Sequence, residues 1–319
     1  MLRDRVGLRV STGARRWMLA PRRLFGDQKK MRVASPLLAL SLIGAAFNAG
    51  AGTFVTLPNN IDPLSVANGG LINGSQNSNV DQLYIQTLSA TYLPGFADLA
   101  APDEGGTGMV LPSSITYQVK PQGSSQWSTG GTLTLLDHKV TSGVPLVDGE
   151  PQATIFDMVY RDSADNKLVF ATRYLNEVDN DQEVNFLYRY GFTGYQTSAA
   201  WTFATDYDLR MYESGRTDAN TFDLSVPLSP GTVRQKSDIS VSEGNPWSGL
   251  FFVKTDATAY VLGDRAIGFF QAGQEGQEKI GGTIGGFTPV TAVPEPSTYA
   301  MLLAGLGLLV AWGRRLRTL

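Results

Sequence analysis

Four carboxylates at alternate positions form the densest group of potential metal ligands in this sequence. They are Glu177, Asp179, Asp181 and Glu183. Ca²⁺ binds about six to eight oxygen atoms in proteins, so one hypothesis is a Ca²⁺ site in this segment. The segment lacks the sharp-turn glycine and the final glutamate of an EF-hand loop. A solvated hairpin loop, whose charges discourage pairing at a sheet edge, explains the same residues.

A second set of charged residues alternates with apolar residues along the middle of the chain. Its members are Asp157, Arg161, Arg173, Arg189, Asp206, Asp208 and Arg210. Two carboxylates about 5 to 10 Å apart across a cleft would suit a glycoside hydrolase. Alternating Asp and Arg also form ion pairs on the solvent-exposed face of a sheet. We expect this second arrangement, with all these side chains facing solvent.

The sequence contains few residues of the types that other catalytic and metal sites require. His138 is the single histidine, no Gly-x-Ser-x-Gly elbow accompanies it, and cysteine is absent. Zinc and copper sites use histidine and cysteine ligands, so they are not expected. We therefore predict a protein that is not an enzyme and has no cofactor other than the Ca²⁺ considered above.

Two aromatic residues are candidates for carbohydrate binding. Tyr195 and Trp201 flank a turn rich in Gly, Thr and Ser, where their rings could stack on sugars. Most of the other aromatic residues nearby alternate along strand-like runs and are expected in the core.

The elements that position these residues are predicted to be strands. Apolar side chains recur with a period of two in three successive runs, at 154–160, 168–174 and 184–190. If each run forms a hairpin with the next, Phe156 lies opposite Thr172, and Phe170 lies opposite Tyr188. Both pairings keep the apolar residues on one face, which leaves the other face to solvent.

Similar short runs, separated by Gly and Pro, continue through residues 52–287. Many short strands at close spacing are typical of an antiparallel β-sandwich or jelly roll, so we predict one all-β ectodomain. Residues 288–293 are expected to form a stalk after it.

The N-terminal residues carry features of export. Residues 31–51 combine a basic start, an apolar core and the small residues Ala49 and Ala51, which is typical of a secretory signal peptide helix that is cleaved after Ala51. Residues 1–30 form a basic extension, and the true start is either Met1 or Met31.

The C-terminal residues predict a membrane anchor. Residues 297–313 are apolar and would form a helix of roughly 25 Å at about 1.5 Å per residue, close to the thickness of a hydrocarbon core. Arg314, Arg315 and Arg317 follow it, and such residues stay on the cytoplasmic side. A single transmembrane helix is therefore expected, with the ectodomain outside the inner membrane.

A stiff motif precedes this helix, because two prolines fix their φ angles and remove two N–H donors. The motif is Val293, Pro294, Glu295, Pro296, Ser297 and Thr298. Motif, apolar helix and basic tail together resemble the PEP-CTERM sorting domain of Gram-negative bacteria, over residues 293–319. The resemblance implies cleavage by a membrane-embedded exosortase after passage through the secretion translocon. It also implies release to the cell surface or an extracellular polysaccharide matrix, with a role in biofilm.

Charge is divided along the chain. Residues 52–293 hold 13 basic and 26 acidic side chains, a net charge of −13, whereas both ends are basic. Such an acidic domain repels nucleic acid. We therefore predict an exported, non-enzymatic surface or matrix protein, first anchored with its ectodomain in the periplasm. The alternatives are a Ca²⁺-assisted carbohydrate-binding module and, third, a glycan-active hydrolase.

Overall fold

The computed structural model describes most of the region between residues 54 and 291. The described residues are 54–57, 72–73, 83–94, 99–100, 107–108, 111–121, 124–147, 150–204, 208–217, 230–272, 278–291, 301, 303–306 and 308–309. All of them belong to one compact unit, Asn48–Leu319.

The larger of the two main sheets has ten strands. Eight of them lie in the order β1 (Val55–Leu57), β11 (Thr197–Thr202), β16 (Leu250–Thr255), β9 (Leu168–Asn176), β8 (Pro151–Asp162), β7 (Ser128–Pro145), β6 (Pro112–Val119) and β3 (Gln86–Tyr92). All pairs in this series are antiparallel. Two further strands, β12 (Asp208–Leu209) and β15 (Trp247–Ser248), pair with each other in parallel, and β15 joins β9.

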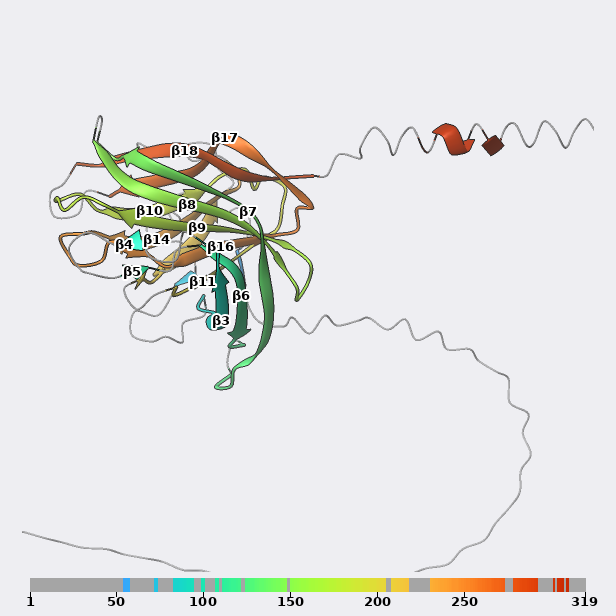
Figure 1. The fold of residues 1–319 in the computed structure, drawn as a ribbon, viewed down its shortest axis with the longest axis horizontal. Coiled ribbons are helices and arrows are strands. Elements are labelled where there is room, and N and C mark those ends of the chain that lie inside the picture. Colours follow the sequence, from blue (N-terminus) through green and yellow to red (C-terminus); the bar gives the residue numbers. More distant parts are fainter. Residues whose placement is uncertain are drawn as a thin grey trace, which may run out of the picture. The chain divides into compact units, whose positions relative to one another are not determined.

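The second sheet has six strands. They are, in order, β18 (Ile280–Val290), β17 (Ala259–Gln271), β10 (Val184–Arg189), β14 (Thr232–Ile239), β13 (Glu213–Thr217) and β2 (Ile72–Asn73). A separate pair is formed by β4 (Leu99–Ala100) and β5 (Thr107–Gly108). In Figure 1, β17 and β18 lie on the opposite side of the domain from β3 and β6. The predicted all-β sandwich is confirmed.

The predicted pairing of these strands is wrong in two respects. β8 and β9 do form an antiparallel hairpin, but Phe156 lies opposite Arg173 rather than Thr172, a shift of one residue. β9 does not pair with β10, because its second neighbour is β16. β10 lies in the six-stranded sheet between β14 and β17, so Phe170 and Tyr188 are not partners.

The central strands β8 and β9 are buried on both faces. One face packs against the six-stranded sheet, where Ile155 and Phe170 meet Leu187 and Phe269; we call this the inter-sheet core. The other face packs against residues of its own sheet, where Met158 and Phe252 meet Tyr117; we call this the curled-sheet core.

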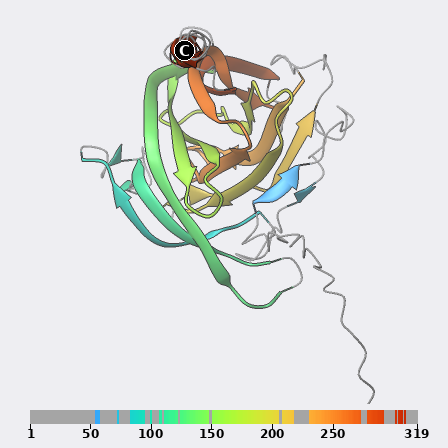
Figure 2. The same ribbon diagram turned by 90° about the vertical axis from the view of Figure 1, so that its right-hand side faces the viewer.

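The second core exists because the ten-stranded sheet folds back on itself. The hydroxyl of Tyr160 in β8 donates to the carbonyl of Pro112 in β6, at 2.8 Å, although β7 separates these strands in the sheet. Figure 2 shows the long green strand β7 running along the domain beside teal β3 and β6. The curl removes the solvent-facing side that the alternating sequence pattern predicted.

The edge of β18 is capped by side chains of the larger sheet instead of by a further strand. Asp157 accepts from the backbone N–H of Phe287 at 2.6 Å, and the Lys139 ammonium donates to the carbonyl of Gly285 at 2.7 Å. These bonds satisfy backbone groups that an edge strand would otherwise expose. β18 continues to Val290, so the first three residues of the expected stalk belong to the sheet.

The predicted terminal segments lie mostly outside the described residues. Helical backbone is present at 301, 303–306 and 308–309, within the predicted span 297–313. Among the described residues, no helix has both the length and the apolar character needed to cross a bilayer. The basic extension, the signal peptide with Ala49 and Ala51, the motif 293–298 and the tail with Arg314, Arg315 and Arg317 fall outside the described residues.

Candidate functional site

The acidic segment between β9 and β10 separates into two parts. Glu177, Asp179 and Asp181 are exposed, and Glu177 accepts a hydrogen bond from the hydroxyl of Thr154 at 3.0 Å. Glu183 is buried, and its backbone N–H donates to the side-chain oxygen of Gln271. The structure therefore brings only Glu183, of the four predicted ligands, into a group of converging carboxylates.

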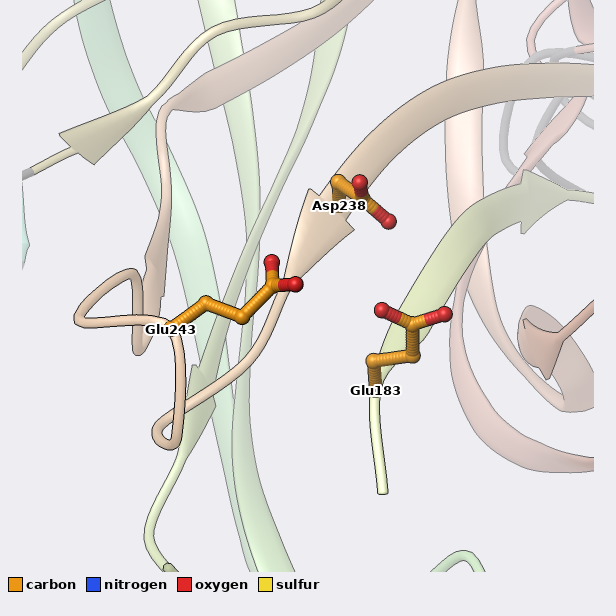
Figure 3. Close-up of side chains that lie close together, drawn as sticks. All are labelled: Glu183, Asp238 and Glu243. Atoms are coloured by element: carbon orange, nitrogen blue, oxygen red, sulfur yellow. The ribbon is translucent and has the colours of Figure 1, made fainter. Parts of the chain in front are cut away.

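That group consists of Glu183, Asp238 and Glu243, and we call it the Glu183 cluster. One carboxylate oxygen of each residue lies within 4.8 Å of the others, and Figure 3 shows the three side chains pointing toward a common space. Among the described residues no other group of three acidic, histidine or cysteine side chains converges in this way.

A β-bulge explains how Asp238 joins the cluster. β10 and β14 pair with Val184 opposite Ile239 and Phe186 opposite Lys236, so two residues of β14 face Asn185 alone. A bulge bends its strand and turns a side chain in a new direction. The Asn185 amide donates to Glu183 at 3.0 Å and to Asp238 at 2.6 Å, which holds the two carboxylates side by side.

A tight turn after β14 brings Glu243 close to Glu183 and Asp238. Ser240 and Asn245 exchange backbone hydrogen bonds of 3.0 and 2.8 Å across the turn. Gly244 has a φ of +74°, a conformation that glycine adopts without steric cost. The turn thereby fixes the backbone around Glu243.

The donor set of this cluster suits a hard cation. Three carboxylates supply oxygen atoms alone, as Ca²⁺ requires, and no nitrogen or sulfur ligand that zinc or copper would favour. Three carboxylates are fewer than the ligands Ca²⁺ takes, so carbonyl oxygens or water would complete the shell. Like charges at this distance repel, and a bound cation would offset that repulsion.

Four of the charged residues expected on the solvent face are buried, so that prediction is wrong for Asp157, Arg173, Arg189 and Asp208. Arg161 and Arg210 are partly exposed, and Asp206 lies outside the described residues. Asp157 accepts from Arg189 at 2.7 Å in the inter-sheet core, and Arg173 pairs with Asp208 in the curled-sheet core. Burial raises the pKa of Asp157, although Arg189 opposes this effect, and burial lowers the pKa of Arg173. These groups are structural partners and not an exposed pair of catalytic carboxylates.

The aromatic candidates do not form a sugar platform. Trp201 is 1% exposed and packs edge-on against Phe203, with 4.6 Å between ring centroids, so its prediction as a ligand-binding residue is wrong. Tyr195 is partly exposed, and its hydroxyl lies 3.1 Å from that of Thr291. His138 lies in β7 opposite Met158.

Sequence reasoning missed Asp238 and Glu243 as partners of Glu183. Asp238 lies in a strand and Glu243 in a Ser-Glu-Gly-Asn turn, so each resembles an ordinary surface carboxylate. The signal that unites them is the pairing of β10 with β14, which is a contact between segments distant in sequence.

Comparison with known proteins identifies one segment of the chain. The model of the PEP-CTERM protein-sorting motif matches residues 292–317. No curated protein and no solved structure matches the chain. The predicted resemblance at the C-terminus is confirmed. This motif is a substrate signal for exosortase processing, so it marks the chain for export and for the cell surface or exterior.

Proposed function

We propose that this chain is a non-enzymatic protein of the cell surface or extracellular matrix, and that its β domain associates with exopolysaccharide in biofilm. The observation that carries the proposal is the sorting motif at residues 292–317, because it marks the chain for the cell surface or exterior, where a polysaccharide partner would be met.

The interior of the domain supports the absence of catalysis. Asp157 and Asp208, two of the carboxylates that a hydrolase would need exposed, are 2% and 6% exposed and form ion pairs with arginine. A glycoside hydrolase uses two carboxylates that flank a sugar bond. Neither of these side chains can reach a substrate without opening a core.

Charge supports the choice of polysaccharide over nucleic acid as the partner. Residues 52–293 carry a net charge of −13, and Arg173, Arg189, Arg216 and Arg234 are buried. Binding to nucleic acid relies on exposed basic side chains that contact phosphates. A neutral polysaccharide, or an acidic one bridged by cations, avoids this repulsion.

Sorting is tested by changing Pro294 and Pro296 to Ala in a host that contains an exosortase. We expect an uncleaved product that stays in the membrane fraction, because the motif loses its extended, stiff backbone. Arg314→Lys serves as the control, because it keeps the positive charge of the tail. Normal processing of the proline variant would contradict the role of the motif.

Association with polysaccharide is tested with residues 52–292 and exopolysaccharide extracted from the same host. We expect the domain to sediment with the polymer and to leave soluble sugars unaltered. Release of reducing ends would instead support the hydrolase alternative. Failure to sediment, with or without Ca²⁺, would contradict polysaccharide association while leaving the sorting result intact.

The Glu183 cluster favours one alternative, a Ca²⁺-assisted carbohydrate-binding module. Calorimetry with CaCl₂ alone tests it, since the exposed loop and the cluster offer separate sets of carboxylates. If the cluster binds Ca²⁺, Asp238→Asn abolishes the heat signal, and Asp179→Asn with Asp181→Asn leaves it unchanged. The reverse result would assign Ca²⁺ to the loop, and no signal in the unaltered chain would exclude both.

A further inference from the structure

A buried lysine and a buried aspartate meet at the rim of the curled-sheet core. The Nζ atom of Lys254 in β16 lies 2.5 Å from Oδ2 of Asp162 at the end of β8. The side chain of Lys254 is 8% exposed and that of Asp162 is fully buried. β9 lies between the two strands, so the contact bridges across one strand of the sheet.

Three neighbours surround this pair, and each has a distinct chemical character. The hydroxyl of Tyr117 donates to Oδ2 of Asp162 at 2.6 Å. The carboxylate of Asp165 lies 3.3 Å from Nζ of Lys254 and is partly exposed. The ring of Phe54 lies 4.3 Å from the same nitrogen and helps to exclude water.

The turn after β8 is built to hold the Asp162 carboxylate in one position. Its Oδ1 atom accepts from the backbone N–H of Ala164 at 2.9 Å, and its own N–H and carbonyl pair with Lys167 and Asn166. A Cβ atom at Gly131 would lie 2.5 Å from Oδ1, so only glycine permits this approach. Both oxygens of the carboxylate are therefore fixed by named donors.

We propose that Lys254 and Asp162 condense to form an intramolecular amide bond, an isopeptide crosslink between β16 and β8. Transfer of one proton from the ammonium to the carboxylate across this contact gives an amine and an acid, the two forms that can condense. The amine nitrogen then attacks Cγ of Asp162. A bond forms between Nζ and Cγ, and the bond between Cγ and Oδ2 breaks.

The neighbouring groups serve this reaction. The N–H of Ala164 stabilises negative charge on Oδ1 as the nitrogen attacks, in the manner of an oxyanion hole. Asp165 accepts the second proton that the nitrogen loses and passes it to Oδ2. Oδ2 already carries the first proton, so it leaves as water. Tyr117 donates to the leaving oxygen. The balance is one amine and one acid giving one amide and one water, with no oxidant or reductant.

The crosslink would suit an exported chain that has no cysteine. Disulfides stabilise many exported proteins by constraining the unfolded chain, and this sequence cannot form one. An amide between residues 162 and 254 closes a long loop in the same way, and it resists reducing agents.

Peptide mapping of the full-length chain tests the proposal. After denaturation and trypsin digestion, the crosslink joins peptide 162–167 to peptide 237–265, in which cleavage at Lys254 is blocked. The joined species weighs one water less than its two parts, and fragmentation assigns the bond to Asp162 or Asp165. Separate peptides 162–167, 237–254 and 255–265 from folded protein would overturn the proposal, as would a bond at Asp165.

Two variants separate the reaction from an ordinary ion pair. Lys254→Arg keeps the positive charge but has no primary amine, so we expect no joined peptide and a lower thermal midpoint. Asp165→Asn removes the proton acceptor, and we expect a smaller joined fraction that increases slowly with time after refolding. A joined fraction equal to that of the unaltered chain in Asp165→Asn would overturn the role of Asp165.

Discussion

The Asp157–Arg189 and Arg173–Asp208 ion pairs are both buried, but they connect different parts of the domain. The first crosses the inter-sheet core and joins β8 to β10, and Asp157 also accepts from the N–H of Phe287 in β18. The second lies within the larger sheet and joins β9 to β12. The first pair therefore holds two sheets together, whereas the second connects strands of one sheet.

The partners that remain after each pair is broken also differ. The guanidinium of Arg173 donates to the carbonyl of Ser248 at 3.2 Å and lies 4.3 Å from the centre of the Trp247 ring. Arg189 has a long contact of 3.4 Å to the carbonyl of Phe287 and lies 5.4 Å from the centre of the Phe170 ring, and its Nε atom has no hydrogen-bond partner. Arg189 thus depends more on its carboxylate than Arg173 does.

The largest effect is expected from Asp157→Ala. Loss of this carboxylate leaves the charge of Arg189 uncompensated and the N–H of Phe287 without its acceptor. Breaking a buried ion pair costs about 3 to 5 kcal/mol, so we expect the free energy of unfolding to fall by that amount. Urea titration measures it. Arg161→Ala, at a partly exposed position of the same strand, is the control and should cost less than about 1 kcal/mol.

A smaller effect is expected from Asp208→Ala. Arg173 keeps the carbonyl of Ser248 and the Trp247 ring, and the N–H of Ala204, which loses its acceptor, is only partly buried. We therefore expect a loss of about 2 to 3 kcal/mol, close to that of one charged hydrogen bond. The same urea titration compares the two variants. A loss as large as that of Asp157→Ala would show that the two ion pairs contribute equally to stability, whatever partners each arginine keeps.

The two pairs also show what the sequence can and cannot predict. Period-two alternation correctly predicted strands over 154–160 and 168–174, because side chains alternate between the faces of any strand. It assigned the charged face to solvent, which is wrong because β10, with Arg189, lies in the second sheet and packs over β8, and because Asp208 of β12 reaches Arg173 of β9. Alternation reports which side chains share a face, and it does not report what covers that face.

The candidate site shows the same limit. Glu183 was predicted as a ligand from the density of carboxylates around it, but its partners come from β14 and the turn after it. Neither the bulge of β14 opposite Asn185 nor the pairing of β10 with β14 has a local signature. By contrast, the sorting motif was predictable because its information lies in consecutive residues.

Gly286→Ala tests how closely the Asp157 carboxylate must approach the edge of β18. A Cβ atom here would lie 2.3 Å from Oδ2 of Asp157, so the carboxylate must move away from Arg189 or from Phe287. Overpacking of this kind costs about 1 to 3 kcal/mol. In the Asp157→Ala background the obstacle is gone, so the same change should cost less. Equal costs in the two backgrounds would show that Gly286 is required for another reason.

The smallest change in stability is expected when a single tyrosine hydroxyl is removed from each core. Tyr160, in the curled-sheet core, donates to the carbonyl of Pro112, whereas the hydroxyl of Tyr174, in the inter-sheet core, has no hydrogen-bond partner. A hydrogen bond contributes about 1 kcal/mol, so Tyr160→Phe should lower the free energy of unfolding by that amount at neutral pH. Tyr174→Phe should leave it unchanged or raise it, because a buried polar atom without a partner is removed.

The free energy of unfolding at alkaline pH depends on the same two hydroxyls. Burial raises the pKa of both Tyr160 and Tyr174 above that of an unfolded tyrosine, which is about 10. The unfolded chain therefore loses these protons first, and stability that is fully present below about pH 10 declines as the pH rises further. Each Phe variant should reduce this decline by about 1.4 kcal/mol per pH unit above pH 10, measured by urea titration at several pH values. An unchanged slope in either variant would mean that its hydroxyl ionises in the folded protein, and so that its core admits water.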